Sequence, residues 1–411
     1  MHLLILAARN LTRHLRRTLL TGAAIAFGLT MMVLMISLQE GSYKAMLKSG
    51  ISNLAGHVVI EDPAHREQGE ADLVVPNITA LSAALRPILP EAILAPRMQV
   101  GGLLTSPTNS TGIGLRGLIP SAESQITDFD DKLVRGEWLQ DDDARGIVIG
   151  VAMADSLGVE IGDKLVFMGQ GEDGDVTSRL FRLRGVFKTG GAELDSFIGL
   201  TPLAAVQELN RTPDAAHQLT IHLPNPRRAE AARQLARTVV PDTLDVLTWD
   251  QALPDIVALI KVDRFSGDIM MIVIGFIVMM GVLNTVLMSV MERTREFGVL
   301  LGIGMRPNRI ALLVLTEGLV LGLVSTAVGM GLGAALSYPL VTQGLDYSIF
   351  MGGAESMEME GILVDAVIHG AYSPERMANY ALAAVLFTVC AAAYPAWTLT
   401  RLSPVDAMRS V

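Results

Sequence analysis

The residue types that most often carry enzymatic chemistry are present in this chain but do not form a reaction centre. Cys390 is its one cysteine and lies in an apolar stretch, which excludes a disulfide or a cysteine-ligated metal site within the chain. The seven histidines contain no His-Glu-x-x-His pair, and His217 and His222, which flank one expected strand, favour surface or edge positions over a metal site. No G-x-S-x-G nucleophile motif and no G-x-x-x-x-G-K-S/T phosphate loop occurs. We therefore expect no catalytic residue, no metal site and no cofactor in this chain.

Two glycine-rich runs could be mistaken for ligand-binding loops. The run from Gly169 to Gly174 (GQGEDG) matches G-x-G-x-x-G, but a dinucleotide site needs this motif between a strand and a helix. Here it lies between KLVFM and SRLFRLRGVF, which are both strand-like, so it favours a hairpin turn. The second run, from Gly329 to Gly333 (GMGLG), lies inside a long apolar stretch and favours close packing of helices.

Acidic residues in or near apolar stretches are the remaining candidates for a site. Glu317 is a functional suspect by default if it lies in a membrane. It is less than two turns from the expected boundary, however, so we favour a carboxylate that reaches the interface or accepts a hydrogen bond there. The acidic run of Glu355, Glu358 and Glu360 favours an exposed or partner-facing loop, with a cation site as the alternative.

Four apolar blocks dominate the composition. Charged residues make up 18% of the chain and mean hydropathy is +0.42, whereas a soluble domain normally has about 25% charged residues. Each block approaches or exceeds the roughly 17–25 residues that span a bilayer. The first is longer than the apolar centre of a signal peptide and is followed by no A-x-A cleavage site, which favours a membrane helix. The blocks cover residues 18–38, 269–290, 310–340 and 380–397.

The charges outside these blocks predict the orientation. Three short segments are basic: the one before the first block, the one between the second and third blocks, and the one after the fourth. Together they contain ten arginines and three acids, Glu292, Glu296 and Asp406, which gives a net charge of +7, although the whole chain has a net charge of -10. Positive segments stay in the cytoplasm, so we expect both termini there and residues 39–264 and 341–379 outside. No basic stripe for nucleic acid occurs. The arginines are Arg9, Arg13, Arg16, Arg17, Arg293, Arg295, Arg306, Arg309, Arg401 and Arg409.

The expected fold class is a membrane α-helical protein with four transmembrane helices and a large extracytoplasmic mixed α/β domain. Strand-like and helix-like stretches alternate over residues 39–264. From Trp249 the pattern becomes helical and is expected to continue through Arg264 into the second span as a stalk. The domains are then residues 1–38, with an initial helix and the first span, residues 39–264, and residues 265–411, with three spans.

The segment 291–304, between the second and third spans, reads as a short amphipathic helix on the inner face of the membrane. Its sequence, MERTREFGVLLGIG, starts with charged residues and continues with apolar ones, and the helix is expected to break between Gly302 and Pro307. A helix that joins two spans is a natural lever, because a partner that pushes on it moves both spans.

This segment resembles the signature of the FtsX-like ABC permease superfamily, E-R-x-x-E-x-G-x-x-x-x-x-G. Four further stretches are similar to the family in the same order along the chain: AARNLTRHLRRTLLT, GVAMADSLGVEIGDKLVF, EGLVLGLVSTAVGMGLG with Glu317, and YPAWTLTRLSPVDAMRS with Pro395, Ala396, Pro404 and Ala407. GHVVIEDP after the first span is similar to the lipoprotein-releasing and macrolide-exporter permeases, and cell-division members have a smaller outer domain. The signature residues are Glu292, Arg293, Glu296, Gly298 and Gly304.

The resemblance implies the permease subunit of an ABC transporter in the bacterial inner membrane. Two copies of a separate ATPase would bind ATP and Mg, and a second permease copy or a paralogue would complete the complex. The implied substrate is a lipoprotein, lipid or peptide, with a periplasmic acceptor protein as a further partner. A receptor or scaffold with a ligand-binding outer domain is the alternative, but a single span would suffice for it. An enzyme acting in the membrane is a third interpretation, and we find no nucleophile–base or metal group for it.

The resemblance also assigns roles within the coupling segment. We expect Phe297, Val299 and Leu300 to face an apolar cleft of the ATPase, and Gly304 to supply backbone freedom before Pro307. The charged residues Glu292, Arg293, Arg295 and Glu296 are expected at the polar rim of that interface.

Overall fold

The computed structural model describes residues 15–65, 72–171, 174–348, 356–359 and 362–401. The chain divides into two compact units. The membrane unit consists of Met1–Tyr43, Ile260–Leu345 and Ile368–Val411, and the α/β unit consists of Lys44–Leu259 and Asp346–Val367. The expected residues Arg9, Arg13, Glu355, Glu360, Pro404, Asp406, Ala407 and Arg409 lie outside the described ranges.

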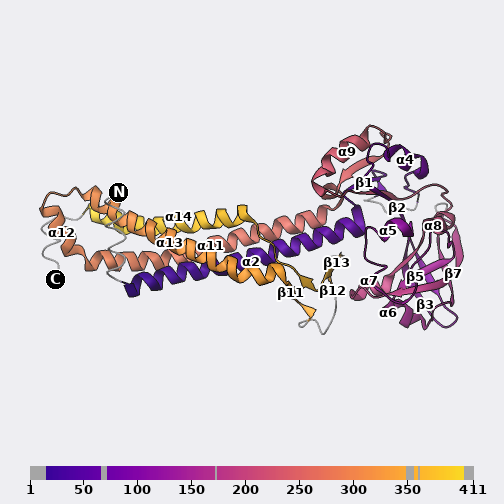
Figure 1. The fold of residues 1–411 in the computed structure, drawn as a ribbon, viewed down its shortest axis with the longest axis horizontal. Coiled ribbons are helices and arrows are strands. Elements are labelled where there is room, and N and C mark those ends of the chain that lie inside the picture. The colour runs from indigo at the N-terminus through magenta and orange to yellow at the C-terminus, as the bar shows by residue number, and fades with distance from the viewer. Residues whose placement is uncertain (1–14, 66–71, 172–173, 349–355, 360–361, 402–411) are drawn as a thin grey trace. The chain divides into compact units, whose positions relative to one another are not determined.

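Four long helices form the membrane unit, and each is long and apolar enough to cross a bilayer, which confirms the four expected spans (Figure 1). All four are longer than their apolar blocks, and the first two extend furthest beyond them. The first continues without a break past Leu38, and the second is unbroken from Pro254, whereas Trp249–Ala252 forms a separate short helix, α10. The proline restricts the preceding Leu253 to a non-helical conformation, with φ -121° and ψ 60°. The long helices are α2 (Leu15–Gly50), α11 (Pro254–Glu292), α13 (Pro307–Thr342) and α14 (Pro374–Thr400).

Glycines on α13 let its neighbours approach closely. A Cβ atom at Gly318 would lie 2.6 Å from Ala392 of α14, and one at Gly333 would lie 2.6 Å from Val33 of α2. A Cβ at Gly329 would lie 2.7 Å from the backbone oxygen of Ala26. The Thr30 hydroxyl of α2 donates a 3.2 Å hydrogen bond to the Gly329 carbonyl. Small residues and interhelical hydrogen bonds are the usual means of helix association in lipid. The expected packing role of the GMGLG run is therefore confirmed at Gly329 and Gly333.

The α/β unit is built on a ten-stranded sheet with the order β10-β1-β9-β2-β3-β8-β5-β7-β4, in which β6 pairs with both β2 and β7 (Figure 1). The strands are β1 (Val58–Glu61), β2 (Ile93–Thr105), β3 (Ser110–Leu118), β4 (Leu133–Gly136), β5 (Gly146–Gly150), β6 (Lys164–Gln170), β7 (Val176–Phe187), β8 (Ile198–Pro202), β9 (Gln218–His222) and β10 (Asp245–Thr248). The helical segments are η1 (Ile51–Ala55), α4 (Ile78–Leu85), α5 (Pro120–Glu123), α6 (Val151–Leu157), α7 (Ala192–Phe197), α8 (Leu203–Asn210), η2 (Pro226–Arg228), α9 (Ala229–Arg237) and α10.

The long strand β2 joins two hydrophobic cores. Its first half pairs with β9 at Ile93–Arg97, beside a core formed by β1, β9, β10, α4 and α9. Its second half pairs with β3 and β6, beside a core that contains Phe167 and Phe181. The expected alternation of strands and helices is confirmed, and the run from Gly169 to Gly174 connects the antiparallel strands β6 and β7. The surface or edge position expected for His217 and His222 is wrong, because both are buried and β9 is an internal strand.

The segment between α13 and α14 contains short strands that the sequence pattern did not predict. Strands β11 (Leu345–Asp346) and β14 (Val367–Ile368) pair, and β12 (Ser356–Met359) pairs antiparallel with β13 (Ile362–Asp365). Glu358 lies in β12, opposite Leu363.

Two adjacent glycines in β2 provide a test of packing in the α/β unit. A Cβ at Gly102 would lie 2.6 Å from the Phe167 ring and against the Met168 carbonyl, whereas a Cβ at Gly101 would meet nothing within 4 Å. Gly102→Ala is expected to destabilise the unit by about 1–3 kcal/mol through overpacking. Gly101→Ala should be neutral or stabilising by up to about 1 kcal/mol. Thermal unfolding followed by tryptophan fluorescence would measure both, and equal melting temperatures would contradict this account.

Candidate functional site

The segment between α11 and α13 forms a defined helix–turn unit. Helix α12 (Thr294–Gly302) starts after Arg293, so Glu292 belongs to the end of α11 rather than to the coupling helix. After α12 the amide of Met305 donates to the Leu300 carbonyl and the amide of Gly304 donates to the Leu301 carbonyl, each at 3.0 Å. Gly304 has φ +96°, which completes the Schellman arrangement that ends many helices. The expected need for a glycine at position 304 is met by this geometry.

Phe297 anchors α12 to the helix bundle of its own chain. Its side chain is 1% exposed and packs against Val290 of α11, Ile310 and Val314 of α13, and residues of the last turn of α14. Leu300 and Leu301 are half-buried on the same side. The expectation that Phe297 faces a partner is therefore wrong for this structure. Its ring instead holds one end of α12 on three spans.

An ion pair fixes the start of α12 (Arg293) to a span. The Arg293 Nη1 donates to both carboxylate oxygens of Glu317 at 3.1 and 3.3 Å, and the two side chains are 13% and 14% exposed. Arg293 also donates from Nε to Glu296 at 3.3 Å, and its guanidinium lies 5.0 Å from the centroid of the Phe297 ring. Glu317 thus accepts hydrogen bonds, as the favoured interpretation predicted. Arg293 was expected at the rim of a partner interface and instead lies inward.

The opposite face of α12 is open. Arg295, Glu296, Val299 and Gly302 recur at helical spacing and are exposed, and the exposed Ile303 follows at the C-cap. The apolar members are notable, because Val299 is 48% exposed and Ile303 is 81% exposed. Gly298 lies on the buried side. The helix therefore presents two apolar side chains flanked by charges, while its other face is held by Phe297 and Arg293.

At the other end of the four spans, charged residues form a second cluster within the membrane unit. Glu40 of α2 is 8% exposed and accepts from Arg376 of α14 at 3.0 Å and from Arg264 of α11 at 3.2 Å. The Tyr43 hydroxyl donates to Asp263, and Tyr380 donates to Asp268 at 2.8 Å. These contacts join α2, α11 and α14.

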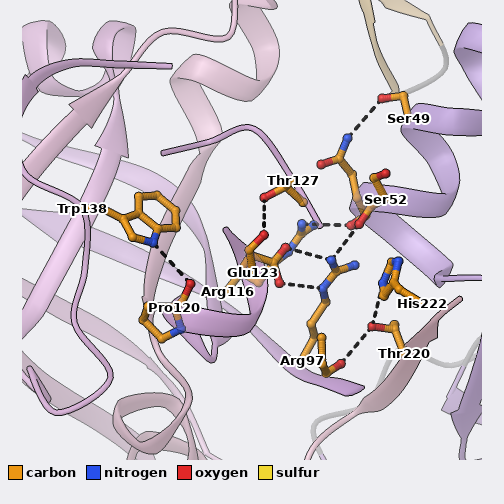
Figure 2. Close-up of polar contacts among 12 residues, drawn as sticks. Ser49, Ser52, Arg97, Arg116, Pro120, Glu123, Thr127, Trp138, Thr220 and His222 are labelled. Atoms are coloured by element: carbon orange, nitrogen blue, oxygen red, sulfur yellow. Dashed lines mark hydrogen bonds and ion pairs between the residues drawn. The ribbon is translucent and has the colours of Figure 1, made fainter. Parts of the chain in front are cut away.

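In the α/β unit, two arginines hold the turn that follows α2. This turn, η1, is a π-helix, a form that frequently occurs at functional sites. Arg97 donates from Nη2 to the Ser52 carbonyl at 2.7 Å, and Arg116 donates from Nη1 to the Asn53 carbonyl at 3.1 Å. Figure 2 shows both guanidinium groups directed at this turn, with Glu123 paired to Arg97 at 2.8 Å. We refer to Arg97, Arg116 and Glu123 as the arginine clasp.

Comparison with known families agrees with this architecture. Residues 18–239 match the MacB-like periplasmic core domain, and residues 269–404 match the FtsX-like permease C-terminal domain. The chain belongs to the MacB-like periplasmic core domain family, and its C-terminal part is an FtsX-like permease domain. It is the permease component of an ABC transporter of the LolC/LolE and MacB type.

Relatives of the permease span most of its length. The lipoprotein-releasing system transmembrane protein LolC of Neisseria meningitidis is 24% identical over 333 residues, which cover 78% of this chain and 77% of that protein. The corresponding LolE of Haemophilus influenzae is 21% identical over 325 residues, which cover 77% of each chain. Among solved structures, the periplasmic region of MacB from Actinobacillus actinomycetemcomitans aligns with 50% of this chain and 94% of its own, at 17% identity and a TM-score of 0.35.

Sequence reasoning missed the second charged cluster and the arginine clasp. A signal for the cluster was available, since Glu40 lies at the end of an otherwise apolar stretch and needs a partner. The clasp had no such signal, because Arg97 and Glu123 are 26 residues apart on different elements. No group of three or more His, Cys, Asp or Glu residues in the described ranges could hold a metal ion.

The Arg293–Glu317 pair should behave as one unit. Arg293→Gln and Glu317→Gln each leave a charge in a largely buried position, which is expected to cost about 1–3 kcal/mol. The double variant should cost less than the sum of the single ones. Glu296→Gln is the matched control, because this partner of Arg293 is 55% exposed and should cost less than about 1 kcal/mol. Thermal unfolding in a neutral detergent measures the cycle, and additive single effects would refute the coupling.

The turn at Gly304 should tolerate no side chain. Gly304→Ala is expected to destabilise the α12 turn by about 1–2 kcal/mol, because a Cβ is unfavourable at positive φ, and Gly304→Val should be worse. Gly302→Ala is the control, since Gly302 is exposed and helical with nothing within 4 Å of a Cβ. It should be neutral or stabilising. Limited proteolysis in this segment and the melting temperature would show the difference, and equal responses would argue against the Schellman turn as the constraint.

Proposed function

We propose that this permease transmits the ATP-driven motion of a separate ABC ATPase to its α/β unit, which acts on a lipoprotein, lipid or peptide. The observation that carries the proposal is the two-faced structure of α12. One face is fixed to the bundle by Phe297 and Arg293, and the other presents the exposed Val299 and Ile303. A helix seated in this way moves with the spans when a partner pushes on its open face.

The partner in this proposal is a pair of ATPase subunits that bind ATP and Mg, with one permease or paralogue above each. The coupling segment is residues 291–304, and Arg295 and Glu296 lie at the rim of the proposed contact. Glu292 ends α11 just before α12, and Leu300 packs α12 against the bundle. Exposed apolar anchors usually supply most of the binding energy at such interfaces, and charges at the rim supply less. Val299 therefore keeps the ATPase contact that we expected for it, and Ile303 takes the place of Phe297 and Leu300.

The orientation follows from charge. Arg295, Arg306, Arg309 and Arg401 are exposed in the segments that follow α11 and α14. Positive segments of this kind remain in the cytoplasm. We place both termini and α12 in the cytoplasm, and residues 39–264 and 341–379 on the periplasmic side of a bacterial inner membrane.

The substrate class is inferred from the relatives. LolC and LolE are named as transmembrane proteins of a lipoprotein-releasing system, so a lipoprotein is the first substrate to test, followed by lipids and peptides. A periplasmic acceptor protein would receive what is released. Helices α2 and α11 both continue along the sequence from the membrane unit into the α/β unit, so they are the covalent links for the motion.

The double variant Val299→Ala with Ile303→Ala tests the coupling role. It removes the exposed apolar anchors and should reduce co-purification of the ATPase at least tenfold, about 1.4 kcal/mol, and lower substrate-coupled ATP turnover. The melting temperature of the permease should change little, because Ile303 is largely exposed and Val299 is about half exposed.

Two controls separate this role from general damage. Leu332→Ala removes a side chain of similar exposure, 52%, from the middle of α13 and should leave ATPase binding intact. Phe297→Ala should lower the melting temperature, because a buried aromatic ring costs about 3–5 kcal/mol to remove. Full ATPase binding and full coupled turnover in the Val299/Ile303 variant would refute the proposed contact.

A further inference from the structure

A polar cavity of about 250 Å³ lies beside the arginine clasp within the α/β unit. Its walls come from η1, β1, β2, β3, β9, α10 and the residues beside them, and they include Arg97, Gln99, Arg116, His217 and Leu253. On the same volume measure one water molecule needs roughly 10–15 Å³. The cavity therefore has room for a ligand group of several heavy atoms.

Among the described residues, the two arginines at this cavity have more hydrogen-bond donors than acceptors that bind them. Arg97 uses Nε and Nη2 on Glu123 and on the Ser52 carbonyl, but its Nη1 is buried and has no hydrogen-bond partner among the described residues. Within the same described ranges, Arg116 donates one hydrogen bond, from Nη1 to the Asn53 carbonyl. A guanidinium carries five N–H groups. Most of the donors of Arg116, which lines the cavity, are therefore available to a ligand.

The buried charges beside the cavity also leave an excess of positive charge. Arg97 is 5% exposed and Arg116 is 9% exposed, and Glu123 is the one carboxylate that acts on Arg116 among the described residues. Burial, together with repulsion by Arg97, lowers the pKa of Arg116 to about 10, and Glu123 partly opposes this shift. Two buried cations thus share one anion. Buried charges are costly unless they are paired, so a second anion at this place would be favourable.

We infer that this cavity binds an oxyanion, specifically a phosphate group, through the Arg116 guanidinium. Its planar fork matches two oxygens of a phosphate, and the surplus positive charge supplies the attraction. The phosphate could belong to a phospholipid headgroup or be inorganic, and the chemistry of recognition is the same for both. The bound anion would face the guanidinium that also holds the Asn53 carbonyl of η1, so its binding would bear directly on the turn that follows α2.

The full-length permease in a neutral detergent at low chloride is the material for the test. Inorganic phosphate and a soluble short-chain phosphatidylglycerol would be titrated separately by calorimetry, with melting temperature as a second readout. Arg116→Lys keeps the charge and removes the fork, and Arg116→Gln removes both. We expect binding at least tenfold weaker in Arg116→Gln and an intermediate loss in Arg116→Lys. Arg228→Gln, an exposed arginine of η2, is the matched control and should bind like the native chain.

A second variant guards against damage to η1, since Arg116 also holds that turn. Gln99→Trp adds bulk to the exposed wall of the cavity and leaves both arginines in place. It should weaken phosphate binding while the melting temperature without ligand stays unchanged. Binding of the lipid alone identifies a headgroup site, and binding of inorganic phosphate alone identifies a site for the free ion. Binding of neither, or equal losses in Arg116→Gln and Arg228→Gln, overturns the inference. The ATPase takes no part in these measurements, so their outcome is independent of the proposed coupling function.

Discussion

The attachment of α12 to the helix bundle depends on the ion pair between Arg293 and Glu317, which is largely removed from water. Glu317 is on a span and Arg293 is at the start of α12, and their contact joins two elements that an apolar interface alone would allow to slide. Hydrophobic contacts are non-directional, whereas hydrogen bonds are directional. Arg293 donates from Nη1 to both oxygens of Glu317 and from Nε to Glu296, which restricts the orientation of its guanidinium. The Phe297 ring beneath Arg293 adds an aromatic face to the same cation. One end of the lever is therefore fixed in orientation as well as in position.

The same physical arrangement recurs at the other end of the bundle, where Glu40 receives both Arg264 and Arg376. Between these two charged clusters the helices meet through small residues and apolar side chains, such as Gly318 against Ala392 and Ile25 against Val282. Close backbone contact leaves little empty space to absorb a displacement, since packed interiors transmit strain. In the proposed coupling, a push on α12 would therefore be passed along the spans rather than lost within the bundle.

Sequence patterns predicted the four spans and the strand–helix alternation because each depends on local periodicity and hydropathy. They failed where the answer depends on which neighbour a side chain meets. Leu300 and Leu301 follow Phe297 by three and four residues and share one face of α12 with it. Val299 and Ile303 lie on the other side. Both faces carry apolar side chains, so their presence alone could not decide which face the bundle covers. His217 and His222 were misplaced for a related reason, since the position of β9 inside the sheet is set by pairing with β1 and β2, which are distant in sequence.

The arginine clasp connects the coupling proposal with the inferred phosphate site. The π-helix η1 follows α2 directly, and its Ser52 and Asn53 carbonyls are held by Arg97 and Arg116. A displacement of α2 that reaches η1 would act on the hydrogen bonds between these carbonyls and the two guanidinium groups. Arg97 is restrained by Glu123, but Arg116 has no carboxylate of its own among the described residues. An anion bound to Arg116 would compete with the Asn53 carbonyl for the same guanidinium. The Arg116–Asn53 hydrogen bond would therefore respond to a displacement of α2 differently from the Arg97–Ser52 hydrogen bond.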